Sequence, residues 1–168
     1  MIQKKICMLG GTAVGKTSLV ARYVRNMFSD KYLSSIGVKV DKKTLNVDGT
    51  DVALVLWDIH GDDQFESIRT AYLRGTSGYL LVADGTRKST LDKALDVKRM
   101  VDTAIGDVPF ILVLNKADLA EAWDLSEADE EDLQAKYTVV RSSAKTGAGV
   151  EEAFTRLTKA LMSSALRG

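Results

Sequence analysis

Apolar and polar positions divide this chain into short apolar runs separated by longer mixed segments. The apolar runs predict six strands, at Lys4–Leu9, Val38–Val47, Val52–Trp57, Gly78–Asp84, Pro109–Asn115 and Thr138–Arg141. The segments between them predict five helices, at Lys16–Asn26, Phe65–Leu73, Thr90–Thr103, Glu127–Lys136 and Val150–Leu166. The regular alternation of strand and helix is typical of an α/β protein.

A turn signal modifies this simple alternation near the second and third strands. The segment Asn46–Thr50 contains the pair Asp48-Gly49, which favours a tight turn between antiparallel strands. The other strands are each followed by a helix, which predicts parallel pairing. We therefore expect residues 1–168 to form a single domain, a doubly wound and mostly parallel six-stranded sheet. It has one antiparallel edge strand and five flanking helices, and its ligand lies at the carboxyl ends of the strands.

Composition and charge restrict the possible partners and setting. The 23 basic and 23 acidic residues balance to a formal net charge of zero, so no broad charge footprint for nucleic acid or anionic lipid is present. The single cysteine, Cys7, is most simply a small buried apolar residue in a reducing compartment. No apolar run reaches the roughly 18 residues of a membrane span. We expect a cytoplasmic monomer that binds no nucleic acid. The tail Ser163–Gly168 contains no cysteine for a lipid anchor, so membrane association would require a lipidated tail missing from this sequence.

The most specific motif is a glycine-rich loop between the first strand and the first helix. Residues 10–17 match the pattern Gly-x4-Gly-Lys-Thr, whose backbone N–H groups surround nucleotide phosphates at a helix N-terminus. Lys16 is expected to reach the β- and γ-phosphates, and the Thr17 hydroxyl to ligate Mg²⁺. The candidate phosphate-binding residues are Gly10, Thr12, Ala13, Val14, Gly15, Lys16, Thr17 and Ser18.

A second motif follows the third predicted strand. Asp58 and Gly61 form Asp-x-x-Gly. The aspartate can hold the Mg²⁺ shell, and the glycine allows a backbone N–H to approach the γ-phosphate. Alone this motif is weak, but its distance from the phosphate loop strengthens it.

Two motifs at later strand ends predict the base. Asn115-Lys116-Ala117-Asp118 supplies a carboxylate that can accept two hydrogen bonds from guanine, whereas adenine has neither donor in that place. Ser142–Lys145 ends the sixth strand, where a backbone N–H can reach the guanine oxygen. The candidate base-site residues are Asn115, Lys116, Asp118, Ser143, Ala144 and Lys145.

With these motifs in order, the chain resembles the small Ras-like GTPases, and most closely the Rab branch, over essentially its full length. Lys31–Val38 is similar to a Rab switch I, Phe65–Gly75 to a switch II helix, and Ser143–Phe154 to the passage from the guanine loop into the last helix. The resemblance implies that Phe28 stacks on the base and that Ser35 joins Thr17 and Asp58 as a Mg²⁺ ligand.

The resemblance also implies a function and a set of partners. It implies a GTP-binding switch in vesicle traffic, which binds GTP or GDP with Mg²⁺ and whose segments near 28–40 and 58–75 recruit effectors, exchange factors and GTPase-activating proteins. Trp57 and Tyr72 match two members of the aromatic patch that meets Rab effectors. Val40 stands where the third aromatic residue is usual, so we expect a flatter and less selective surface.

Departures from the family concern hydrolysis. Asp62 occupies the position of the water-orienting glutamine; an ionised carboxylate cannot donate a hydrogen bond and brings negative charge toward the γ-phosphate. We therefore expect weak intrinsic GTPase activity from the candidate catalytic residues Lys16, His60, Gly61 and Asp62. His60 is either a substitute water-positioning group or a surface side chain on a loop. Ser35 replaces the usual threonine, which favours a less ordered switch.

Two other function classes remain open from the residues. Asp62 is also compatible with a nucleotide-binding interaction module whose GTP hydrolysis is negligible. A phosphotransferase on the same fold would need an arginine-bearing lid and an acceptor pocket, and the sequence shows neither.

Overall fold

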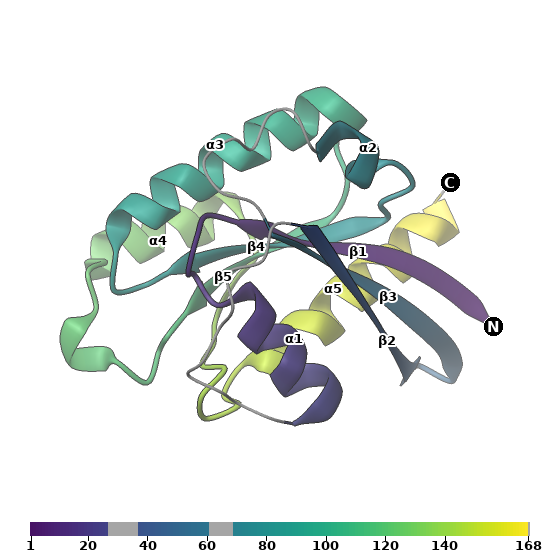
Figure 1. The fold of residues 1–168 in the computed structure, drawn as a ribbon, viewed down its shortest axis with the longest axis horizontal. Helices are drawn as coiled ribbons and strands as arrows, with labels where there is room; N and C mark the ends of the chain where they lie inside the picture. The colour runs from purple at the N-terminus through teal and green to yellow at the C-terminus, as the bar shows by residue number, and fades with distance from the viewer. Residues whose placement is uncertain (27–36, 61–68, 168) are drawn as a thin grey trace.

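The fold is built on one mixed sheet (Figure 1). The computed structural model describes residues 1–26, 37–60 and 69–167. Within them the strands lie in the order β2-β3-β1-β4-β5-β6, with β2 antiparallel to β3 and every other pair parallel. This confirms the predicted fold class. The strands are β1 Ile2–Gly10, β2 Gly37–Val47, β3 Thr50–His60, β4 Gly78–Asp84, β5 Phe110–Asn115 and β6 Val139–Arg141.

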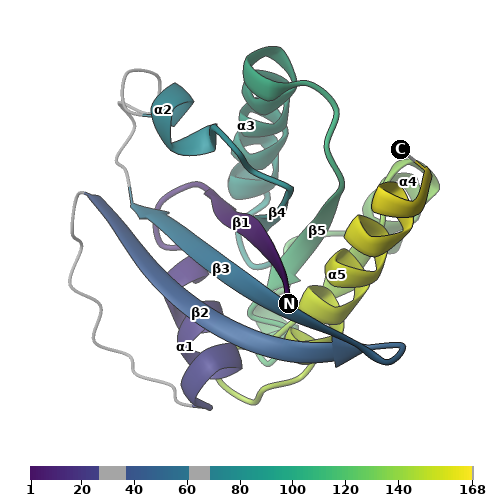
Figure 2. The same cartoon turned by 90° about the vertical axis from the view of Figure 1, so that its right-hand side faces the viewer.

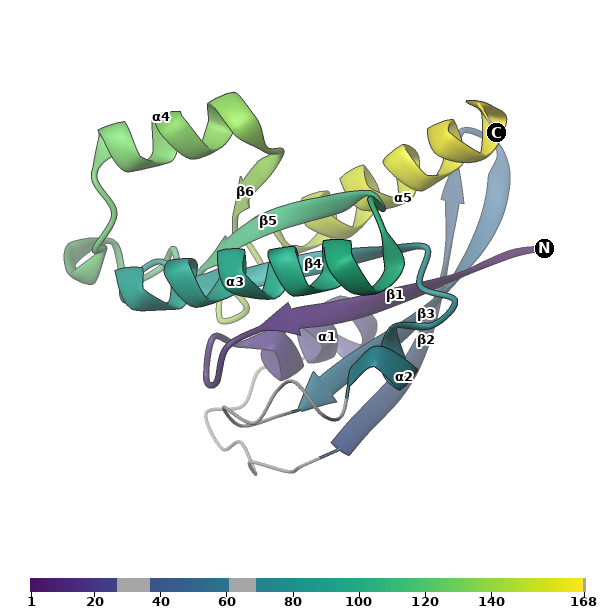
Figure 3. The same cartoon turned by 90° about the horizontal axis from the view of Figure 1, so that it is seen from above.

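Helices cover both faces of the sheet. In Figure 1, α3 and α4 lie over one face of the sheet and α1 and α5 over the other, and Figure 2 shows α2 beside α3. Seen from above, α4 and β6 lie toward one end of the molecule and the β2–β3 hairpin toward the other (Figure 3). The helices are α1 Lys16–Arg25, α2 Arg69–Leu73, α3 Lys88–Ile105, α4 Glu127–Lys136 and α5 Val150–Arg167, with a short 3₁₀ helix, η1, at Ala120–Ala122.

The central strands are buried on both faces, and their side chains alternate between two apolar layers. In β1, Ile6 and Met8 pack with α1 and α5, whereas Cys7 and Leu9 pack with α3. Successive side chains of a strand point to opposite faces, so one strand supplies both layers. Cys7 is fully buried, as expected for a small apolar residue.

The predicted hairpin is confirmed in detail. Asp48 and Gly49 have positive φ values of 50° and 87°, the pair of left-handed residues that a type I′ turn requires. The Asn46 side chain accepts a hydrogen bond from the Gly49 N–H at 3.1 Å and so closes the turn.

The parallel strands finish at one edge of the sheet, and the register brings their ends together. Gly10 of β1 lies beside Val82 of β4, and Asp84 of β4 lies beside Asn115 of β5. Carboxyl ends of parallel strands are where doubly wound sheets bind ligands. The register therefore places the phosphate loop and the Asn115 motif on either side of the end of β4.

A tryptophan secures the connection that follows β4. The Trp123 ring lies against Gly85, where an added Cβ atom would stand 2.0 Å from a ring carbon. The Arg141 guanidinium lies 4.7 Å from the centre of the same ring, and a salt bridge joins it to Glu130. Gly85 is therefore the residue that allows the tryptophan to pack here.

We expect Gly85→Ala to lower the free energy of unfolding by about 1–3 kcal/mol, because the new methyl group overpacks against a half-buried ring. Urea unfolding followed by far-UV circular dichroism measures the change. In a Trp123→Ala background the same substitution should cost much less, since the clashing ring is gone. An equal cost in both backgrounds contradicts the packing argument.

Candidate functional site

The phosphate loop joins the end of β1 to the start of α1, and two of its glycines are sterically required. Gly10 and Gly15 have φ values of 146° and 104°. A Cβ atom on Gly10 would lie 2.3 Å from the Val82 carbonyl oxygen, and one on Gly15 would lie 2.2 Å from Asn115 Nδ2. The loop therefore packs closely against its neighbours and presents the N-terminus of α1, where unpaired N–H groups favour anions.

Lys16 lies across this loop. Its Nζ donates to the carbonyl oxygens of Gly10 at 2.9 Å and Gly11 at 3.2 Å, and only 8% of the residue is exposed. The ammonium group is thus held inside the loop, where it can meet a phosphate without a long side chain having to be ordered. Ser18, another of the predicted phosphate-binding residues, is buried in the first turn of α1.

Asn115, the last residue of β5, connects two loops. Its Nδ2 donates to the carbonyl oxygen of Val14 at 3.0 Å, while its Oδ1 accepts from Ser142 Oγ at 3.0 Å and from the Ala144 N–H at 3.3 Å. Both ends of the amide are used and the residue is 2% exposed, so its orientation is fixed. The predicted phosphate loop and the predicted base loop therefore share one side chain.

Two predicted Mg²⁺ ligands meet at the start of α1. The Thr17 hydroxyl donates to Asp58 Oδ2 at 2.7 Å, and Asp58 is 1% exposed. Mg²⁺ takes oxygen ligands and retains water and phosphate oxygens beside one or two protein groups. This pair of oxygens fits that requirement.

The predicted base loops are also joined. Asp118 accepts a hydrogen bond from Ser143 Oγ at 2.7 Å, and the Ala117 N–H donates to the Ser142 carbonyl oxygen at 2.9 Å. Asp118 itself is exposed, as is Lys145. Ser143 thus orients the carboxylate that was predicted to read guanine.

Lys116, like Asn115, contacts the phosphate loop. It adopts a left-handed φ of 70°, and its Nζ donates to the Ala13 carbonyl oxygen at 3.2 Å and pairs with Asp84 Oδ2 at 2.9 Å. The side chain therefore turns toward the phosphate loop.

The sequence analysis did not identify Asp84, the last residue of β4, as a site residue. The carboxylate is 1% exposed and accepts from the Thr86 N–H at 2.9 Å and from the Arg87 Nε at 2.9 Å. Burial acts to raise the pKa of Asp84, but hydrogen bonds from Thr86, Lys116 and Arg87 outweigh it and lower the pKa to about 2. The spacing Asp-x-Thr at a strand end is the sequence signal that could have revealed this turn.

Several predicted residues cannot be placed. Phe28, Ser35, Gly61 and Asp62 lie outside the described residues, and the same is true of the His60 side chain. In the backbone, His60 is the last residue of β3, so the predicted loop position of His60 was wrong. Their predicted roles stay predictions.

The predicted aromatic patch comes together on β3 and α2. The Trp57 and Tyr72 rings lie 6.3 Å apart between centroids, and Lys5 Nζ stands 3.7 Å from the centre of the Trp57 ring. Val40 pairs with Trp57 across the β2–β3 ladder and is 50% exposed. The patch is a contiguous surface made of two aromatic side chains and one aliphatic one.

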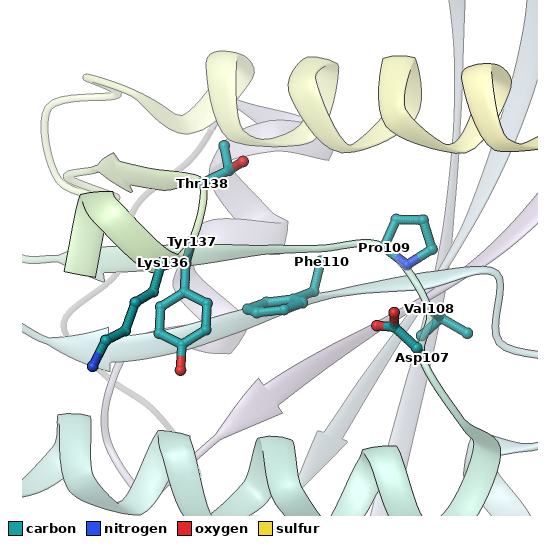
Figure 4. Close-up of a pocket in the computed structure, with 7 residues that line it drawn as sticks. All are labelled: Asp107, Val108, Pro109, Phe110, Lys136, Tyr137 and Thr138. Atoms are coloured by element: carbon teal, nitrogen blue, oxygen red, sulfur yellow. The ribbon is translucent and has the colours of Figure 1, made fainter. Parts of the chain in front are cut away.

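A hollow of about 380 Å³ lies away from these groups. It is formed near the amino end of β5 and before β6, where Figure 4 shows the Phe110 and Tyr137 rings with Pro109 and Asp107 near them. The predicted motifs stand at the opposite, carboxyl ends of the strands. This hollow is therefore separate from the candidate site.

Two comparisons with known proteins found relatives of this chain. The profile of the Ras family matches residues 5–163. The chain is 37% identical over 161 residues to Ras-related protein Rab-1 of Theileria parva, covering 94% of this chain and 73% of that protein. It is 33% identical to human Ras-related protein Rab-8B, with 94% and 78% covered, and 32% identical to Ras-related protein Rab-8A of Bos taurus, with 98% and 82% covered.

The lowered pKa of Asp84 predicts a stability change with pH. The ordinary pKa is 3.8 and the folded value is about 2, so the unfolded chain binds the proton more readily. The stabilisation, about 2 kcal/mol, is therefore complete above about pH 5 and is lost as the pH falls toward 2. We expect Asp84→Asn to remove it, so that variant and wild type converge in free energy of unfolding at low pH.

Urea unfolding at a series of pH values between 7 and 2 tests this expectation. Asp96→Asn is the matched control, because Asp96 is an exposed acid on α3 that pairs only with Arg99 in the described contacts. If the two variants lost the same stability at pH 7, the proposed linkage would be wrong.

Proposed function

The chain belongs to the Ras family and is a small GTPase of the Rab-like kind. We propose that residues 1–168 form a single G domain that binds GTP or GDP with Mg²⁺ and hydrolyses GTP slowly. The observation that carries this proposal is the Asn115 amide. It joins the Val14 carbonyl of the phosphate loop to Ser142 and Ala144 of the base loop. A base-reading group and a phosphate cradle fixed to each other suit a nucleotide.

We assign the nucleotide's parts to the residues that surround them. The N–H groups of the loop from Gly10 to Ser18 and the Lys16 ammonium hold the phosphates, and Thr17 and Asp58 hold Mg²⁺ together with Ser35. Asp118, oriented by Ser143, accepts from the guanine ring N–H and amine. Ala144 and Lys145 form the backbone beside the guanine oxygen, and Phe28 stacks on the base.

We attribute the slow hydrolysis to Asp62. With Asp62 in place of glutamine, the attacking water loses a neutral group that could accept from it and donate to a phosphate oxygen. Gly61 supplies a backbone N–H to the γ-phosphate, and His60 either helps to position water or does not take part.

The switch function depends on the segments near residues 28–40 and 58–75. Ordering of these segments on GTP recruits effectors, while exchange factors and GTPase-activating proteins reset the cycle. Trp57, Tyr72 and Val40 supply a surface for such partners, and the Rab-like relationship suggests a setting in vesicle traffic. The second candidate function is a nucleotide-binding interaction module with negligible GTP hydrolysis. The presence of Asp62 in place of glutamine is compatible with this function as well.

The proposal also covers the cellular location and the oligomeric state. In the part of the chain that the structure describes, no helix has both the length and the apolar character to cross a bilayer. We propose a cytoplasmic monomer with no nucleic-acid partner, consistent with the balanced charge. A lipidated tail would add membrane association.

Guanine recognition gives the first test. We expect Asp118→Asn to weaken GDP binding about tenfold to a hundredfold, because a hydrogen bond to a charged group contributes about 1.5–3 kcal/mol. The variant should bind xanthosine diphosphate more tightly than the wild type does, since the ring carbonyl of xanthine can accept a hydrogen bond from the new amide. Titrations with fluorescent analogues measure both affinities, with the exposed Asp132→Asn on α4 as control. Equal affinity of the wild type for ATP and GTP would show that the base assignment is wrong.

Hydrolysis gives the second test. We expect Asp62→Gln to raise the intrinsic single-turnover rate about tenfold, equivalent to about 1.4 kcal/mol of barrier, with little change in GTP affinity. A group that acts on the transition state changes the rate without a matching change in ground-state binding. His60→Ala measured beside it decides between a water-positioning role, if the rate falls, and a surface role, if it does not. A rate that stays the same or falls in Asp62→Gln refutes the proposed cause of slow hydrolysis.

A further inference from the structure

Arg87, the residue before α3, connects a buried carboxylate to the phosphate loop. Its Nε donates to Asp84 Oδ2 at 2.9 Å, and its Nη2 donates to the carbonyl oxygens of Ala13 at 3.0 Å and Thr12 at 3.3 Å. No motif in the sequence and no part of the proposed function gives this arginine a role. One guanidinium thus spans β4 and the loop from β1.

The carbonyl contacts determine where the loop N–H groups point. In a planar trans peptide the C=O of one residue and the N–H of the next point in opposite directions. The carbonyls of Thr12 and Ala13 are held by Arg87, and that of Ala13 also by Lys116. The N–H groups of Ala13 and Val14 must therefore point away from Arg87, into the loop.

The loop needs such an external hold because of its backbone conformation. Ala13 has a φ of 60°, a left-handed conformation that costs a residue with a Cβ atom about 1–2 kcal/mol. Without contacts on its outer carbonyls, the loop would favour rotation of the Ala13 peptide, which relieves that cost. Contacts on the outer carbonyls oppose the rotation.

Arginine suits this position better than lysine. Asp84 fixes the Nε edge of the guanidinium, while Nη2 reaches two carbonyls at the same time. The planar, forked group can make contacts in two directions, whereas a lysine offers a single charged atom. Asp84 also pairs with Lys116, so one buried carboxylate orients both cations that hold the loop.

We propose that Arg87 is a positioning residue for nucleotide binding, which holds the N–H groups of Ala13 and Val14 toward the phosphates of a bound guanine nucleotide. The inference rests on the proposed function, because it needs a nucleotide at this loop. It concerns a residue that does not itself contact the nucleotide.

The test compares Arg87→Ala, Arg87→Lys and the control Arg99→Ala, an exposed arginine on α3 that pairs with Asp96. Stopped-flow displacement of fluorescent GDP gives the dissociation rate. We expect Arg87→Ala to raise it about tenfold, since two hydrogen bonds from a charged group are lost. Arg87→Lys should recover part of the loss, and Arg99→Ala should match the wild type.

Two further measurements separate positioning from general loosening. The ratio of GDP to inosine diphosphate affinity should stay at the wild-type value in Arg87→Ala, because the base contacts of Asp118 are untouched. In ¹H–¹⁵N spectra of the GDP-bound protein, the Ala13 and Val14 amide signals should shift more than those of residues 115–118. Circular dichroism melting confirms that each variant is folded.

The outcomes distinguish this inference from the proposed function. If the wild type binds no guanine nucleotide, the proposed function fails, and this inference with it. If the wild type binds GDP and Arg87→Ala releases it at the same rate, only the role of Arg87 is wrong. A slower hydrolysis rate with unchanged GDP release also overturns the role, because the arginine would then act on the reacting phosphate. A changed GDP to inosine diphosphate ratio indicates general loosening and overturns it too.

Discussion

The two loops of the candidate nucleotide site are held together by the Asn115 amide. It lies at the end of β5, between the loop that follows β1 and the loop that follows β6, and it donates to one and accepts from the other. The parallel sheet brings those three strand ends to one edge, and the amide fixes the remaining distance between the loops. Loss of this side chain would leave a buried carbonyl of Val14 and a buried hydroxyl of Ser142 without partners, which costs more than the hydrogen bonds themselves contribute.

Helix α1 extends this constraint into the core. Its first residue belongs to the phosphate loop, and further along, Arg22 donates to the Ala144 carbonyl oxygen at 2.7 Å and also binds the Lys145 carbonyl. On the buried side, the Tyr23 ring stacks on Phe154 of α5 at 3.9 Å between centroids. The helix that follows the phosphate loop therefore also supports the predicted base loop from the side. Both halves of the site are fixed to one rigid element with a packed core beneath it.

Sequence reasoning predicted the strands, the hairpin and the motif residues because each depends on local pattern. The bounds of β4 and α4 were correct, and Thr17, Asp58 and Asn115 lie where their motifs indicated. The contacts of Arg87 with the phosphate loop and of Trp123 with Gly85 were not predicted, because they join positions tens of residues apart at spacings that no motif fixes. Asp84 was missed although its turn contacts with Thr86 and Arg87 are local. The 3₁₀ helix at Ala120–Ala122 is too short to produce a periodic signal. Which side chain reaches across a loop is decided by tertiary packing.

Asp84 shows how a site for anions can contain a buried carboxylate. Taken alone, its charge would repel phosphate and would be costly to bury. Arg87 and Lys116 pair with it, and both also donate to the outer carbonyls of the phosphate loop. Lys16 inside the loop leaves the local charge positive, which suits the phosphate proposed to bind there. The carboxylate thus orients the cations on the outer side of the loop, while the inner side is left to N–H groups and one ammonium. In the role proposed for Arg87, the planarity of the peptide bond links the charge on one side of the peptide to phosphate binding on the other.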